Sequence, residues 1–354
     1  MMPKLYRKSP IWLYGLTCIY GAILVALTVL NWYGSDRWWF GKVNLFLPQL
    51  IWLIPGVLLA CLSLVVARKC IWAPVLCMVW VLGPIMGFCW HLHSSSENAE
   101  GISSIRVMTC NIKYGQRDMS ALVDDINNNA PDIVMLQDAN LEMLSNSLKE
   151  LFSKCNVRFR PDGKYIVASK LPLGAVDIRT IPYNGEPHSC LRCQVYIGSN
   201  TVTLYDVHFE SPREGLYEFI TAWRNPGAYS KAILDLKNNL EDRLSQASAL
   251  RELVLLEQGP VIVAGDLNSS DTSMVCKTLR SAGLHDAFNE GGRGYGYTYG
   301  HYMFRNKHPW LTLSWMRIDH ILISSQLKSV SCWTGTGEAS DHRPVYSDLI
   351  FKKN

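Results

Sequence analysis

The sequence predicts an α/β domain over residues 102–354, preceded by an α-helical membrane module over residues 1–93. Two observations carry this prediction. Three long stretches near the N-terminus contain no Asp, Glu, Lys or Arg, and each can supply the roughly 20 apolar residues that cross the hydrocarbon core of a bilayer. After them, β-rich apolar runs alternate with helical patterns, which is typical of a layered α/β domain.

We expect transmembrane spans near 11–31, 46–66 and 71–91. The tryptophans of this module lie mostly at the ends of the spans, where aromatic residues favour the headgroup zone of a bilayer. The first span could instead be a cleaved signal peptide. That alternative is weaker, because the stretch is long, lacks a clear small-x-small cleavage site and is followed by two more apolar stretches.

Basic residues in the short loops predict the orientation of the spans. Five of them lie on one side and two on the other: Lys4, Arg7, Lys8, Arg68 and Lys69 against Arg37 and Lys42. The side that is richer in Lys and Arg is expected to be cytoplasmic. The N-terminus is then cytoplasmic, and an odd number of spans places residues 102–354 outside the cytoplasm.

The formal net charge of +4 comes from the membrane module and not from the domain that follows it. Up to His93 the chain has seven basic residues and one acidic residue, which leaves 27 basic and 29 acidic residues after it. A nucleic-acid binder is expected to concentrate positive charge on its working domain. At the level of net charge this chain does not do so, although a local basic patch is compatible with that balance.

Residues 94–101 are expected to form a short polar linker between the module and the domain. Strands are predicted at 105–110, 133–136, 165–168, 190–197, 202–208, 261–264, 318–323 and 345–350, and helices at 119–129, 141–152, 229–256 and 273–281. Polar side chains stand at or beside the ends of six of these strands: Asn111, Asp138, His208, Asp266, Asn268, Asp319, Asp341 and His342. A lone Asp after a strand is more often a turn residue or a helix cap, so the prediction of a site depends on the whole set.

The ordered set of motifs resembles the endonuclease/exonuclease/phosphatase superfamily, whose fold is DNase I-like. The matching segments are Met108-Thr-Cys-Asn111, Pro131-Asp-Ile-Val-Met-Leu-Gln-Asp138, Val207-His208, Val263-Ala-Gly-Asp-Leu-Asn268, Arg317-Ile-Asp-His-Ile-Leu322 and Ser340-Asp-His-Arg-Pro344. The resemblance implies a four-layer α/β sandwich, in which two sheets are covered by outer helices, and Mg²⁺-dependent hydrolysis of phosphoesters. Mn²⁺ is an alternative ion. The membrane module lies outside this resemblance.

By this resemblance, Asn111 and Asp138 would bind the metal, with Asp341 as a further contributor. Carboxylate and amide oxygens are the ligands that Mg²⁺ prefers. The position of Asp138 is normally Glu in similar proteins, and the shorter Asp makes ligation through a water molecule an alternative to direct ligation. Asp266 would orient or deprotonate the attacking water, and Asn268 would hold that water or a phosphate oxygen.

The resemblance also implies roles for two histidines. His342 would lie at the scissile phosphate, with Asp319 fixing its tautomer and raising its pKa. His208 would bind phosphate or protonate the leaving group. Which histidine donates a proton and which carboxylate accepts one stays open. His320 follows Asp319 directly in a strand, so it should face the opposite side of the sheet and is left out of the site.

Two further segments are candidates for the rim of the site. Residues 291–304 are rich in glycine and aromatic residues and include His301, and residues 210–225 include Arg213 and Arg224. The first segment could hold a base, a lipid chain or the membrane interface, or its aromatic side chains could simply pack on the domain. It does not match a phosphate-binding loop, because no Lys-Ser/Thr pair follows its glycines.

Three functions are compatible with these features. The first is a phosphoesterase in a bacterial plasma membrane that acts on a lipid-linked phosphate or pyrophosphate; the layout resembles that of bacterial membrane-bound phosphoesterases linked to glycopeptide resistance, whose substrate class is polyprenyl phosphate. A sphingomyelinase-like phosphodiesterase is a close variant. The second is a membrane-tethered nuclease acting on DNA or RNA, and the third is a non-enzymatic scaffold. The expected partners are the lipid bilayer and a phosphorylated lipid or nucleic acid, with no protein partner predicted.

Overall fold

The computed structural model describes residues 11–34, 38–91, 104–140, 144–183, 185, 187–222, 226–302, 308 and 310–352. The expected linker at 94–101 lies outside the described residues, as do Lys4, Arg7, Lys8, Arg37 and Arg224 from the arguments on orientation and rim. The chain divides into two compact units, Met1–Phe88 and Cys89–Asn354.

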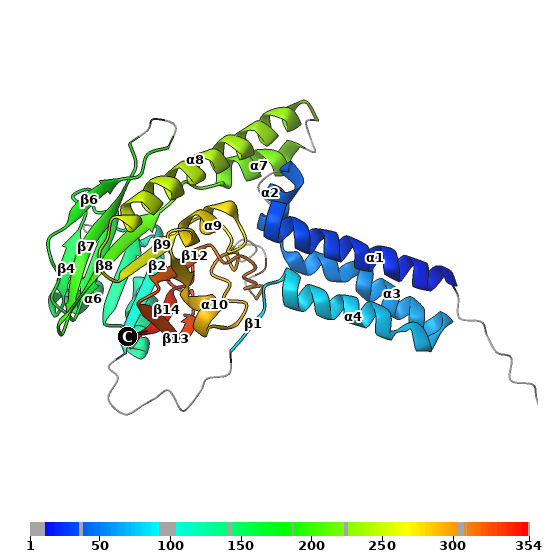
Figure 1. The fold of residues 1–354 in the computed structure, drawn as a ribbon, viewed down its shortest axis with the longest axis horizontal. Helices are drawn as coiled ribbons and strands as arrows, with labels where there is room; N and C mark the ends of the chain where they lie inside the picture. The colour runs from blue at the N-terminus through cyan, green and yellow to red at the C-terminus, as the bar shows by residue number, and fades with distance from the viewer. Residues whose placement is uncertain are drawn as a thin grey trace, which may run out of the picture. The chain divides into compact units, whose positions relative to one another are not determined.

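Three helices of the first unit are long and apolar enough to cross a membrane: Ile11–Tyr33, Gln49–Val66 and Arg68–Ile85. Their regular α-helical parts are α1 (Ile11–Val29), α3 (Leu53–Val66) and α4 (Trp72–Trp80), which lie side by side in Figure 1, and the short helix α2 (Trp39–Phe46) follows α1. The module also has polar contacts, since Asn44 Nδ2 donates to Asn31 Oδ1 at 2.9 Å and Trp52 Nε1 donates to Asn44 Oδ1 at 3.1 Å. These bonds link polar side chains of separate segments within an otherwise apolar unit.

The third apolar helix ends at Ile85, before the expected limit of 91. Gly87 has a positive φ of 72°, and its N–H bonds to the carbonyl of Gly83, which is how a glycine commonly ends a helix. Cys89 and Trp90 then form strand β1 (Cys89–Trp90), which pairs with β11 (Arg293–Gly294). The chain therefore passes directly from the third apolar helix into the second unit.

The second unit contains two six-stranded mixed sheets. The first has the order β10-β12-β9-β8-β7-β6 and the second β13-β14-β2-β3-β5-β4. The strands of the first sheet are β10 (Leu284–Asp286), β12 (Asp319–Ser324), β9 (Val261–Asp266), β8 (Asn200–His208), β7 (Ser189–Ile197) and β6 (Asp177–Thr180). Those of the second are β13 (Leu327–Thr334), β14 (Val345–Phe351), β2 (Ile105–Asn111), β3 (Ile133–Gln137), β5 (Tyr165–Ser169) and β4 (Asn156–Phe159).

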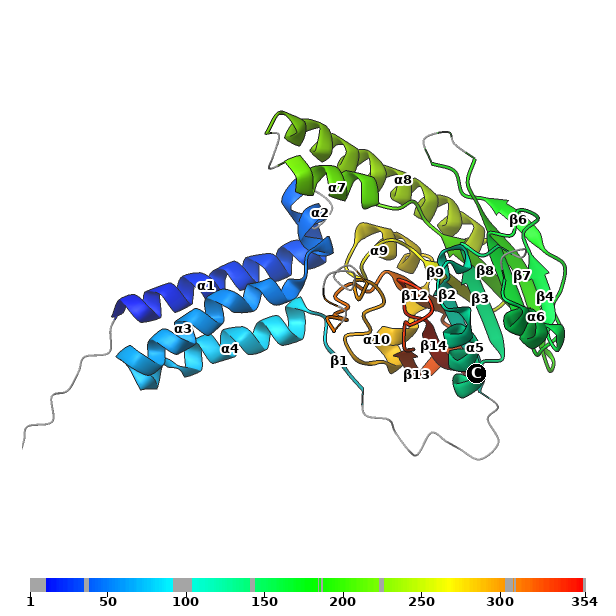
Figure 2. The same ribbon diagram turned by 180° about the vertical axis from the view of Figure 1, so that it is seen from behind.

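Helices cover the outer faces of both sheets (Figure 2). The outer face of the first sheet packs against α8 (Tyr229–Leu255) and α9 (Met274–Arg280), and that of the second packs against α5 (Met119–Asn129) and α6 (Asn146–Ser153). A third apolar cluster lies between the sheets and includes Val107 and Ile133 from one sheet and Leu204 and Ile262 from the other. The predicted four-layer α/β sandwich is thus confirmed. Within the residues that the structure describes, the other α-helices of this unit are α7 (Arg213–Thr221) and α10 (Ala287–Gly291).

Strand register brings the polar strand ends to one edge of the sandwich. Each sheet contains one parallel pair: β2 and β3, in which Asn111 lies opposite Gln137, and β8 and β9, in which His208 lies opposite Asp266. Strands of a parallel pair end on the same side, so their C-terminal residues are neighbours. Strand β12 runs antiparallel to β9 and begins with Asp319 directly opposite Asp266.

A buried polar pair crosses between the sheets one layer below this edge. Gln137 Nε2 donates to Asp206 Oδ1 at 2.6 Å, and both residues are fully buried. Gln137 Oε1 and Asp206 Oδ2 have no hydrogen-bond partner within the part of the chain that the structure describes. Burial raises the pKa of the Asp206 carboxyl well above its ordinary value, and the bond from Gln137 offsets this only in part.

Asp206→Asn is expected to make the protein more stable at pH 8 and less sensitive to pH. Folded Asp206 holds its proton to a higher pH than the unfolded chain does, so the wild-type loses stability as the pH rises above the ordinary carboxyl pKa. The gain at pH 8 should be about 1 kcal/mol or more, the cost of an uncompensated buried polar group. Thermal unfolding of the full-length protein at pH 5 and pH 8 measures it, with Asp177→Asn on the edge strand β6 as the control. Equal pH dependence in wild-type and Asp206→Asn would contradict this assignment.

Candidate active site

Asp266, at the end of β9, lies at the centre of the site. Its carboxylate is buried and accepts hydrogen bonds from the Asn111 side chain at 3.1 Å and the Asn268 backbone N–H at 2.9 Å. The preceding Gly265 has a φ of 144°, and a Cβ there would lie 1.9 Å from the carbonyl oxygen of Val207. Only glycine therefore lets β9 pass close enough to β8 to bring Asp266 beside His208.

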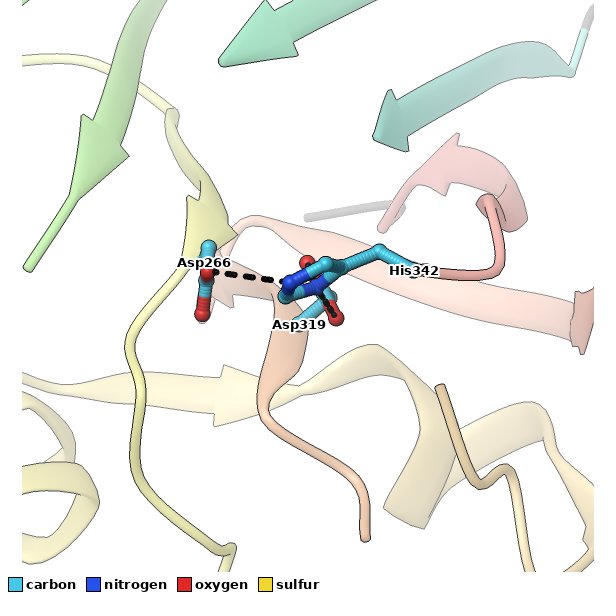
Figure 3. Close-up of side chains that lie close together, drawn as sticks. All are labelled: Asp266, Asp319 and His342. Atoms are coloured by element: carbon cyan, nitrogen blue, oxygen red, sulfur yellow. Dashed lines mark hydrogen bonds and ion pairs between the residues drawn. The ribbon is translucent and has the colours of Figure 1, made fainter. Parts of the chain in front are cut away.

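His342 is held between two carboxylates (Figure 3). Its Nδ1 lies 2.9 Å from Asp319 Oδ2, and its Nε2 lies 3.7 Å from Asp266 Oδ2. Burial opposes protonation of this imidazole, but the charges of Asp319 and Asp266 outweigh burial and raise the pKa of His342 to about 9. Asp319 thus fixes His342 as an imidazolium that points Nε2 towards the centre of the site.

A second imidazole approaches Asp266 from the end of β8. His208 Nδ1 lies 3.1 Å from Asp138 Oδ1, and its Nε2 lies 3.5 Å from Asp266 Oδ2. Desolvation lowers the pKa of His208, but the bond to Asp138 and the charge of Asp266 outweigh it, so the net direction is upward. Burial acts to raise the pKa of Asp138, and the bond and charge of His208 bring it below its ordinary value. His208 and Asp138 therefore form an ion pair.

Asp341 faces basic side chains at the rim of the site. Lys113 Nζ lies 2.5 Å and Arg213 Nη2 3.7 Å from Asp341 Oδ2. Burial acts to raise the pKa of Asp341, but the charges of His342 and Lys113 lower it. The loop before Asp341 is fixed by Ser340, whose hydroxyl donates to the carbonyl oxygen of Asn111 at 2.6 Å.

The structure brings all eight candidate residues into one region. Asp266 contacts four of them directly: Asn111, Asn268, His208 and His342. The other three are linked to this group through a neighbour. Asp319 contacts His342, Asp138 contacts His208, and Asp341 is linked to Asn111 through Ser340. Asn268 is itself fixed, because its Nδ2 donates to the carbonyl oxygen of Phe209 at 2.9 Å.

No individual role was predicted for Lys113, Tyr299 or Ser340, although Ser340 stands in one of the matching motifs. Lys113 lies two residues after Asn111 in a turn with positive φ, and its N–H donates to Asn111 Oδ1 at 3.0 Å. The Tyr299 ring packs on the His342 ring, with centroids 4.8 Å apart. The closeness of Lys113 to Asn111 in the chain was an available signal, whereas the place of Tyr299 depends on its pairing with His342.

His320 and His301 lie outside this network. His320 is buried on the other side of β12, with Nδ1 2.8 Å from Asp286 Oδ2 and Nε2 3.0 Å from the carbonyl oxygen of Ser269. It thus helps to hold the loop that follows Asn268. His301 is also buried, and its Nε2 lies 2.9 Å from the carbonyl oxygen of Gly337 and 3.2 Å from that of Ser340. It supports the loop that carries Asp341 and His342.

Two sets of donors could hold a metal ion. Asp266, Asp319 and His342 form a group whose ligand atoms lie within 4.8 Å of one another. A metal at His342 needs a neutral imidazole, so the ion would have to displace the proton that the charges of Asp319 and Asp266 favour. The oxygens of Asn111, Asp138 and Asp341 border the same region and match the hard oxygen ligands that Mg²⁺ or Mn²⁺ takes. The expected metal ligands Asn111, Asp138 and Asp341 stay a prediction.

The fold consists of two packed sheets with outer helices, and one edge of it is lined by carboxylates, amides and an imidazole held by a carboxylate. This combination is that of a metal-dependent hydrolase of phosphoric ester bonds. The sequence model of the Endonuclease/Exonuclease/phosphatase family matches residues 108–342, a range that contains all eight candidate residues. The chain belongs to this family. No match was found among curated proteins.

Solved structures share the fold. They include a humanised TDP2 from D. rerio (TM-score 0.53, 18% identity, 70% of this chain and 98% of that one) and a truncated TDP2 from Caenorhabditis elegans (0.51, 21%, 70% and 98%). An endonuclease/exonuclease/phosphatase family protein from Bacteroides thetaiotaomicron is also similar (0.50, 16%, 71% and 99%). At these sequence identities the matches show similarity of fold alone.

Asp319→Asn is expected to lower kcat for a generic aryl phosphate ester by about 100-fold or more, the scale of a lost acid–base contribution. The amide cannot stabilise the His342 imidazolium and can present a donor to Nδ1, which turns the ring towards the wrong tautomer. Steady-state kinetics of the full-length protein would measure the loss, with Asp177→Asn as the control. A loss of less than threefold would show that His342 does not depend on Asp319.

Proposed function

We propose that this protein is a membrane-anchored, Mg²⁺-dependent phosphoesterase that hydrolyses a lipid-linked phosphate or pyrophosphate, of the polyprenyl pyrophosphate class, at the extracytoplasmic face of a bacterial plasma membrane. The observation that carries this proposal is the short connection between the apolar helices and the catalytic unit. Three residues separate Ile85, the end of the third apolar helix, from Cys89 in β1. Such a connection spans at most about 14 Å.

Strand β1 is itself part of the catalytic unit. It pairs with β11, and His91 Nδ1 lies 3.0 Å from the carbonyl oxygen of Gly292. If the apolar helices lie in a bilayer, this connection keeps the catalytic unit close to the headgroups, where a lipid substrate is concentrated. The slightly acidic net charge after His93 gives no general attraction for a polyanion such as DNA.

The residues of the site supply the steps of a hydrolysis. A divalent cation on Asn111, Asp138 and Asp341 would neutralise charge on the phosphate oxygens. Asp266 accepts a hydrogen bond from the attacking water and orients it, and Asn268 fixes the Asp266 carboxylate. The His342 imidazolium, held by Asp319, stabilises the charge that develops on the phosphoryl oxygens. His208, paired with Asp138, donates a proton where the leaving oxygen needs one.

Hydrolysis of polyprenyl pyrophosphate by the full-length protein in proteoliposomes tests the proposal. We expect Mg²⁺-dependent release of phosphate, its abolition by EDTA, and a loss of about 100-fold or more in Asp266→Ala. Asp177→Ala serves as the control. Parallel assays with sphingomyelin and plasmid DNA separate the other substrates. Cleavage of DNA without turnover of any lipid phosphate would overturn the proposal in favour of a membrane-tethered nuclease.

Asp138→Glu is expected to tighten Mg²⁺ binding by about tenfold, the scale on which altered metal-site contacts act. The longer side chain reaches further into the site, whereas Asp138 is held back by its bond to His208. Calorimetric titration of Mg²⁺ into the full-length protein measures the affinity without any substrate. Unchanged or weaker binding in Asp138→Glu would indicate that position 138 does not contact the ion.

A further inference from the structure

We propose that Lys113 and Arg213 form a second phosphate subsite beside the catalytic one, so that the substrate carries two directly joined phosphates. The inference rests on the proposed function and narrows its substrate to a lipid diphosphate. It is carried by a local excess of positive charge that comes from separate segments of the chain: the turn after β2, which bears Lys113, and the start of α7, which bears Arg213.

The positively charged side chains outnumber the one carboxylate that they face. Asp341 Oδ2 lies 2.5 Å from Lys113 Nζ and 3.7 Å from Arg213 Nη2, and the more distant Arg117 also acts on it electrostatically. One carboxylate neutralises one positive charge, and the other carboxylates of the site, Asp138, Asp266 and Asp319, face His208 and His342 instead. The surplus is local, because the part of the chain after His93 has slightly more acidic than basic residues. A site built this way attracts a further anion.

Both cations are held beside the candidate active site. Lys113 lies in a turn that is fixed twice, since its own N–H bonds to Asn111 and the N–H of Tyr114 bonds to the carbonyl oxygen of Asp138. Arg213 Nη2 lies 3.4 Å from the hydroxyl of Tyr299, whose ring packs on His342. The Arg213 side chain is still 62% exposed, so an incoming ligand can reach the guanidinium.

A phosphate group fits these side chains better than the headgroup of a neutral diester. The guanidinium donates two parallel hydrogen bonds to phosphate oxygens, and the ammonium adds a point charge. The choline group of a diester such as sphingomyelin is positively charged, so it would instead meet like charge there. In a diphosphate, the terminal phosphate can lie at His342 while its neighbour lies between Lys113 and Arg213.

The two subsites then have different roles in the reaction. Water attacks the terminal phosphorus, and the bond from that phosphorus to the bridging oxygen breaks. The bridging oxygen leaves with the lipid monophosphate, whose new charge is stabilised by Lys113 and Arg213. The other product is orthophosphate, and one proton from the water passes to solvent.

Binding of two phosphonates to the full-length protein in the presence of Mg²⁺ tests the subsite. Methylenediphosphonate mimics the diphosphate and cannot be hydrolysed, and methylphosphonate fills one subsite only. We expect the diphosphonate to bind at least about tenfold tighter to the wild-type, and Arg213→Ala to remove most of that difference while leaving methylphosphonate binding unchanged. Lys113→Met should act in the same direction, and Arg179→Ala on β6 is the control. Equal affinities in the wild-type, or equal losses for both phosphonates in Arg213→Ala, would overturn the subsite.

Kinetics separate this inference from the proposed function. If the wild-type hydrolyses polyprenyl pyrophosphate but Arg213→Ala leaves KM and kcat unchanged, the subsite is refuted and the function stands. If the phosphonate pattern holds without lipid turnover, the subsite stands and the function is refuted. A single-stranded oligonucleotide is also compared with prenyl diphosphate as a competitor for binding. If the oligonucleotide competes more strongly and its competition depends on Arg213, the diphosphate assignment is overturned in favour of a nucleic-acid strand.

Discussion

The site depends on one buried carboxylate that joins the two sheets. Asp266 ends a strand of the first sheet, and Asn111, which ends a strand of the second, donates a hydrogen bond to it. A buried carboxylate is costly unless cations or donors compensate it, and here His208 and His342 approach it from two sides. The packing of the sheets and the electrostatics of the site are therefore linked, because any shift between the sheets would leave this charge less well compensated.

The two histidines share Asp266 and differ in the second carboxylate that each one faces. Asp319, which faces His342, is fully buried at the start of β12, whereas Asp138, which faces His208, is partly exposed. His342 is therefore held as a cation, which suits stabilisation of a charged phosphate. His208 is held in a less buried pair, where a proton can be exchanged with substrate or solvent.

Much of this arrangement could be predicted from the sequence, because strand ends with polar residues are a local signal. The order of Asn111, Asp138, His208, Asp266 and Asp319 along the chain matched strands whose ends converge, and the alternation of side chains along β12 separates Asp319 from His320. Strands β1, β4, β6, β10, β11 and β13 were not predicted. β1 and β11 have two residues each and β10 has three, while β4 and β6 are exposed edge strands. β13 is interrupted by the polar residues Lys328, Ser329 and Ser331, so its apolar pattern is weak. The contacts of Lys113 and Arg213 with Asp341 could not be predicted, since they depend on side chains that are far apart in the chain.

We expect oxygen ligands to hold the metal while His342 stays with its carboxylates. Anomalous scattering from Mn²⁺ in crystals of the protein would locate the ion directly. We expect a metal peak bounded by oxygens of Asn111, Asp138 and Asp341, with His342 Nδ1 still bonded to Asp319. A peak coordinated by a nitrogen of His342, together with Asp266 and Asp319, would contradict it.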